Sequence, residues 1–215
     1  MKLKLLTHLV TTGLLCLLLS SCAIPWENLT QNPRVPEVSQ DTDTDAVSWY
    51  DATCTTTTDL RTAAEPAPVK ENQSSTEDTN KTVAYYAANR DAFAKAEETF
   101  TKLARNITSG HAAEESAKQL TELLGSQRDL YARLLDELNP LVKDPDKAVL
   151  TINSNTTRLT KMNAAFTTRW SQIVYSVPIP NENTAKAVNN LKSCKGILSS
   201  NAPATSSQAP APGFY

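Results

Sequence analysis

Histidine is the first residue type to consider, because Ser–His and Cys–His nucleophilic schemes need an imidazole base. The chain has two histidines, and only His111 lies outside the first 21 residues. It follows Ser109-Gly110 and precedes Glu114, at the expected entrance of a helix. Nothing near it in the sequence offers an oxyanion cradle. We therefore interpret His111 as an ordinary surface histidine rather than a catalytic base.

Carboxylates occur as adjacent pairs at Glu97-Glu98, Glu114-Glu115 and Asp136-Glu137. Neighbours on a helix point about 100° apart, and no pair falls on an apolar stripe, so solvated faces are expected. A ferritin-like di-metal site needs Glu-x-x-His from two helices, which His111 alone cannot supply. Residues 41–45 alternate like the start of an EF-hand loop but lack its glycine and final glutamate. The sequence therefore predicts no metal site, no cofactor and no catalytic residue.

The start of the chain has the order of a secretory signal peptide. Lys2 and Lys4 precede an apolar stretch that closes on Leu19-Ser20-Ser21-Cys22, and small residues at a cleavage point complete such a leader. The Leu-Ser-Ser-Cys sequence resembles the lipobox of bacterial lipoproteins. This resemblance, which covers residues 1–22, implies cleavage before Cys22, lipidation of its thiol (with acyl chains such as palmitate) and anchoring on the extracytoplasmic face of the cell membrane or outer membrane.

Two alternatives to the lipobox stay open. One is an ordinary signal peptide with a chance cysteine. The other is a retained membrane helix, although the apolar stretch is shorter than the ~20 residues that spanning needs.

Two cysteines remain once Cys16 is removed with the leader and Cys22 carries lipid. Outside the cytoplasm Cys54 and Cys194 are expected to pair, and the alternative is two buried free thiols. Zinc is less favoured, because His111 is the one nitrogen ligand at hand. The chain has 21 Lys and Arg against 23 Asp and Glu. Such a balance argues against a nucleic-acid partner.

Composition divides the chain into a signal peptide (1–21), a lipidated and largely disordered linker (22–79), a helical domain (80–198) and a disordered tail (199–215). The linker is rich in Pro, Ser, Thr, Asp and Asn and has few apolar residues to offset the entropy of ordering. Within it, residues 46–60 could dock on a core through Val47, Trp49, Tyr50, Cys54 and Leu60.

Apolar side chains at seven-residue spacing predict three long helices in the domain. The first covers about 81–107, and the second runs from beyond Gly110 to Asn139-Pro140. The third has Asp144 as N-cap and Pro145 at its first position, and ends before Pro178. A shorter helix is expected over about 183–195. Short connections favour an all-α, antiparallel up-down bundle of three long helices and one shorter one.

Most aromatic residues of the domain fall on the inward stripes, where core filling is the default. The alternative is a ligand pocket between the helices, lined by Tyr86, Gln127, Tyr131 and Trp170. Gln127 favours this alternative mildly, because it is a polar residue on an otherwise apolar stripe.

Taken together, these features predict a membrane-anchored extracytoplasmic lipoprotein with a non-enzymatic interaction or structural role at the bacterial cell envelope. Its expected partners are the membrane, through Cys22, and an envelope protein of unknown identity. The alternative function is a lipid-anchored small-molecule binding protein. Heptad stripes also serve self-association, so a homo-oligomer stays open.

Overall fold

The computed structural model describes residues 41–65 and 75–195, and these residues form helices without any strand. The all-α prediction is confirmed. In chain order the elements are α2 (Thr44–Ala64), α3 (Thr76–Asn106), α4 (Ala112–Leu138), the short 3₁₀ helix η2 (Asn139–Leu141), α5 (Pro145–Val174) and α6 (Glu182–Asn189). The predicted signal peptide, Cys22 and the tail from residue 199 lie outside the described residues.

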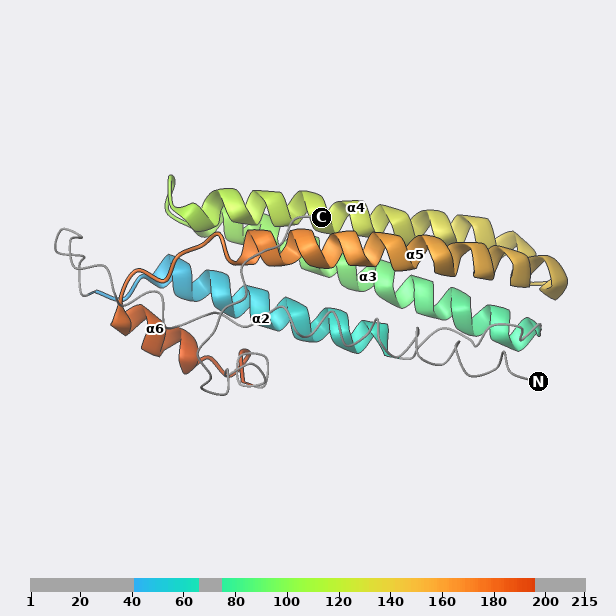
Figure 1. Cartoon of the computed structure of the whole chain (residues 1–215), viewed down its shortest axis with the longest axis horizontal. Coiled ribbons are helices and arrows are strands. Elements are labelled where there is room, and N and C mark those ends of the chain that lie inside the picture. The colour runs from blue at the N-terminus through green and yellow to red at the C-terminus, as the bar shows by residue number, and fades with distance from the viewer. Residues whose placement is uncertain (1–40, 66–74, 196–215) are drawn as a thin grey trace, which may run out of the picture.

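The three long helices α3, α4 and α5 run side by side along the long axis of the molecule (Figure 1). Asp144 caps α5 by accepting a hydrogen bond from the Lys147 amide, and Pro145 is the first residue of that helix, as predicted. Helix α3 begins at Thr76, earlier than the predicted 81. A reciprocal pair of hydrogen bonds between Ser75 and Asp78 fixes this start.

The predicted stripes form the core of the bundle. Buried apolar side chains from α3, α4 and α5 include Tyr86, Phe93, Phe100, Ala113, Ala117, Leu120, Leu124, Tyr131, Leu134, Leu138, Ile152, Leu159, Phe166, Trp170 and Ile173. Gly125 on α4 leaves room for the end of the Glu97 side chain of α3, because a Cβ built there would lie 3.1 Å from a carboxylate oxygen of Glu97.

Helix α2 departs from the prediction. Its residues were assigned to the linker 22–79 with a docked patch at 46–60, but they form a helix of 21 residues that packs antiparallel to α3. Contacts at three levels define this register: Asp45 with Thr108, Trp49 with Phe100, and Asp59 with Lys95. The folded unit therefore begins well before residue 80, and residues 46–60 are part of its core.

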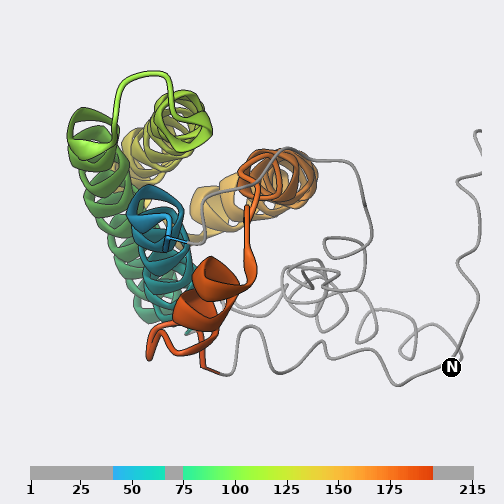
Figure 2. The ribbon, with the colours of Figure 1, turned by 90° about the vertical axis from the view of Figure 1, so that its left-hand side faces the viewer.

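Helix α6 lies beside the first half of α2 (Figures 1 and 2). It was expected over 183–195 but ends at Asn189, and turns continue to Lys195. Asn181 caps the helix through a hydrogen bond to the Thr184 amide. The end of the described chain thus returns to α2 rather than extending the helix.

Candidate functional site

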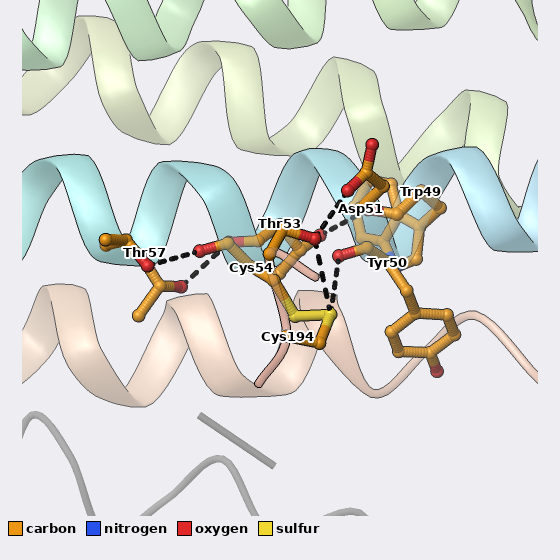
Figure 3. Close-up of a disulfide and its surroundings, with 9 residues drawn as sticks. Trp49, Tyr50, Asp51, Thr53, Cys54, Thr57 and Cys194 are labelled. Atoms are coloured by element: carbon orange, nitrogen blue, oxygen red, sulfur yellow. Dashed lines mark hydrogen bonds between the residues drawn. A yellow bond between two sulfur atoms is a disulfide. The ribbon is translucent and has the colours of Figure 1, made fainter. Parts of the chain in front are cut away.

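Several potentially reactive side chains lie where α2 meets the end of the described chain. A disulfide between Cys54 and Cys194 is at the centre of this region (Figure 3). The predicted pairing is confirmed. The two Cα atoms are 5.0 Å apart, and the cysteines are 4% and 2% exposed. The Cys194 sulfur also lies 3.6 Å from the backbone carbonyl oxygen of Tyr50. Such burial keeps reductants and other thiols away, which suits a structural rather than a catalytic disulfide.

One turn before Cys54, two aromatic residues of α2 hold the end of α5. The Trp49 indole N–H donates to the Val174 carbonyl at 3.4 Å, and the Tyr50 hydroxyl donates to the Val177 carbonyl at 2.7 Å. Val174 is the last residue of α5, and the last carbonyls of a helix have no partner within it; Val177 lies in the turn that follows. Both valines are buried, so these bonds satisfy carbonyl groups that would otherwise be buried unpaired. Burial raises the pKa of Tyr50 to about 12.

His111 is the N-cap residue of α4 and is bonded through both ring nitrogens. Its Nδ1 accepts the Ala113 amide at 3.1 Å, and its Nε2 lies 3.0 Å from the Asp43 carboxylate. With Nδ1 as acceptor, the proton of a neutral ring is on Nε2 and is donated to Asp43. No ring nitrogen is left to take a proton from a nucleophile. His111 therefore joins two helix ends, a contact that the sequence did not reveal.

Asp43 connects this junction to α2 and α6. Its carboxylate caps α2 by accepting the Ala46 amide at 2.9 Å, and its own amide donates to the Thr184 hydroxyl at 2.9 Å. Partial burial raises the pKa of Asp43, but the hydrogen bonds from Ala46 and His111 outweigh this effect and keep the pKa below its ordinary value. In the stretch 41–45 that alternates like a calcium loop, Asp43 thus caps α2 and Asp45 accepts the Thr108 amide.

The four predicted pocket residues, Tyr86, Gln127, Tyr131 and Trp170, are all buried. Three of them belong to a continuous row of aromatic rings in contact. Neighbouring centroids in this row are 5.4 to 6.1 Å apart, in the order Trp49, Phe100, Trp170, Phe166, Phe93, Tyr131, Tyr86. Rings in such contact favour core filling over a cleft. One shallow hollow among the described residues lies on the outside of α3 and α4, beside Glu97 and Arg128.

Amides accompany the tyrosines in the core. Asn89 donates to the carbonyls of Ala63 and Tyr85 and so ties the end of α2 to α3. Gln127 Oε1 and Asn155 Nδ2 are buried without a hydrogen-bond partner. Burial raises the pKa of Tyr131 well above its ordinary value. The sequence signalled Gln127 by its place on a stripe, whereas Asn155 gave no such signal.

The adjacent carboxylates lie on solvated faces, where Glu97 pairs with Arg128, Glu98 with Lys102 and Glu114 with Lys118. In the part of the chain that the structure describes, no group of three His, Cys, Asp or Glu side chains could hold a metal ion. Within the same residues, no helix combines the length and apolar character needed to cross a bilayer.

No family model, no curated protein and no solved structure matches this chain.

Proposed function

We propose that this protein is an extracytoplasmic lipoprotein, anchored in a bacterial membrane through Cys22, with a non-enzymatic interaction or structural role at the cell envelope. The anchor is inferred from the Leu-Ser-Ser-Cys sequence at residues 19–22. The bundle would then stand at the membrane surface on the chain between Cys22 and α2.

The Cys54–Cys194 disulfide carries this proposal. Thiols are kept reduced in the cytoplasm of most organisms, whereas disulfides form and persist in oxidising compartments. A bond that closes 140 residues and is buried at both ends supports export of the chain.

The non-enzymatic role is supported by how the reactive side chains are used. Both ring nitrogens of His111 make hydrogen bonds within the fold. The tyrosines of the core contact other rings. Because these side chains cap helices and fill the core, they support a scaffold role, in which the outer surface of the bundle makes the interactions.

The proposal is tested in cells by fractionation and thiol labelling. The wild-type chain should be found in the membrane fraction, and Cys22→Ser, which cannot be lipidated, should leave that fraction. Alkylation of the chain from cells lysed directly in denaturant should not label Cys54 or Cys194 until a reductant is added. Both thiols reacting without reductant, or Cys22→Ser staying membrane-bound, would contradict the proposal.

A further inference from the structure

Helix α5 differs from the other helices in the apolar side chains that it exposes. Among the described residues, two large hydrophobic side chains are exposed to solvent, Leu150 (71%) and Met162 (39%). Both belong to α5. Figure 2, which looks along the bundle, places α5 at its edge, so one side of this helix is free of other described helices.

The charge of α5 also differs from that of its surroundings. The one acidic residue of α5 is Asp146, which is exposed in the first turn, four residues before Leu150. From Lys147 to Asn181 the chain has no Asp or Glu, and the basic residues of this stretch are Lys147, Arg158, Lys161 and Arg169. Lys147 and Arg158 are paired with Asp144 and Glu137.

Two of these cations have no carboxylate partner among the described residues. Within the same part of the chain, Arg169 is bonded only to the side-chain amides of Gln119 and Gln172, at 3.3 and 3.4 Å. Lys161 makes no hydrogen bond or ion pair with any described residue. The four lysines of α3 and α4, in contrast, are all held in ion pairs, such as Lys95–Asp59 and Lys102–Glu98. Among the arginines of these two helices, Arg105 and Arg133 make no ion pair with a described residue.

Helical geometry brings these features together. About three turns separate Leu150 from Lys161, so the two side chains project along nearly the same line. Arg169 follows about two turns later and is rotated by roughly 80° from that line, toward Gln119 of α4. The outer side of α5 thus combines an exposed Leu with unpaired positive charge along more than half of a helix of 30 residues.

We propose that the outer side of α5, defined by Leu150, Lys161 and Arg169, binds the anionic phospholipid surface of the membrane. A bilayer interface offers negative headgroups for the two cations and an apolar layer just beneath them for the leucine. A protein partner would have to bring both features itself. The inference rests on the proposed anchor, which would hold this weakly binding surface beside the bilayer.

Vesicle sedimentation tests the proposal with the mature chain from residue 22, carrying Cys22→Ser so that no acyl chain contributes. We expect pelleting with vesicles of equal phosphatidylglycerol and phosphatidylcholine, little pelleting with phosphatidylcholine alone, and weaker binding at high salt. Each cation near an anionic surface changes partitioning about fivefold. The double variant Lys161→Gln/Arg169→Gln should therefore partition about 25-fold less.

The matched control is Lys95→Gln/Lys102→Gln, which removes the same charge from exposed positions of α3 and should change partitioning less than twofold. Leu150→Ser should weaken binding at low and at high salt alike. Equal binding to both vesicle types, or equal losses in the two double variants, would overturn the proposal. Capture by anionic wall polymer without vesicle binding would also overturn it. Because the acyl chain is absent, these outcomes are independent of whether Cys22 is lipidated.

Discussion

Removal of the Cys54–Cys194 disulfide is the perturbation whose size follows most directly from the structure. The bond links residues that are 140 positions apart. In the chain-entropy model, closure of a loop of this length restricts the unfolded state by about 5 kcal/mol. Domains of this size are stable by roughly 5–15 kcal/mol, so the disulfide contributes a large share of the total.

The variant to measure is Cys54→Ala/Cys194→Ala, unfolded by urea next to the oxidised wild type. We expect its free energy of unfolding to be lower by about 3–5 kcal/mol, the upper part of the range measured for native disulfides. The dependence on urea should become steeper, because an uncrosslinked unfolded chain exposes more surface.

The control for this experiment is reductant. Dithiothreitol should lower the stability of the wild type nearly to that of the variant, and it should leave the variant itself unchanged. A loss below 1 kcal/mol, in a wild type whose mass confirms the disulfide, would refute the reasoning. In that case the remaining contacts of α2, among them those of Trp49 and Tyr50, would be sufficient to hold it in place.

Three further predictions concern single residues. Gly125→Ala should leave the free energy of unfolding in urea unchanged or raise it by up to about 1 kcal/mol. Alanine is the better helix former by about that amount, and the end of the Glu97 side chain can move away from the added methyl group. A loss above about 1 kcal/mol would show that Glu97 is held rigidly against position 125. The raised pKa of Tyr50, about 12, means that the folded state holds this proton more tightly than the unfolded state. Its contribution is therefore complete below pH 10 and is lost as pH rises from 10 to 12, and the slope of stability against pH should be shallower in Tyr50→Phe than in the wild type. His111→Ala should cost about 1 kcal/mol through the lost cap and leave cellular function intact, whereas His111→Asn, which can still cap α4, should recover most of that stability; loss of function at unchanged stability would indicate catalysis.

The sequence was sufficient for α3, α4 and α5 because their inward residues are large, apolar and regularly spaced. Phe93, Phe100 and Ile107 mark one such stripe, and Asp144-Pro145 marks the start of α5. The disulfide followed from counting cysteines in a chain expected to leave the cytoplasm.

Helix α2 was missed because much of its buried side is polar. Thr53 and Thr56 are 4% and 3% exposed, so the helical spacing that begins at Ala46 and Trp49 continues through threonines rather than leucines. Each of these residues lies three or four positions from the next, and Asp43 is a suitable N-cap. These signals could have indicated the helix, but a Thr-rich, Pro-flanked composition concealed them.

The sequence predicts where the residues of the site lie on their helices, but it does not predict which residues of other helices they contact. Spacing along the chain places His111 at the start of a helix, but it does not bring the ring beside Asp43, 68 positions away. Spacing likewise places Gln127 inside the bundle without showing that its carbonyl oxygen lacks a partner. Such long-range pairings depend on how the helices pack, which local patterns do not encode.

The mass of the mature protein, purified from a bacterial membrane, tests the central claim most directly. We predict a chain that begins at Cys22 and is heavier than its amino-acid sequence by a diacylglyceryl group, with or without a third acyl chain. An unmodified thiol at Cys22, or a first residue anywhere else, would contradict the lipoprotein assignment and remove the reason to expect the bundle at a membrane.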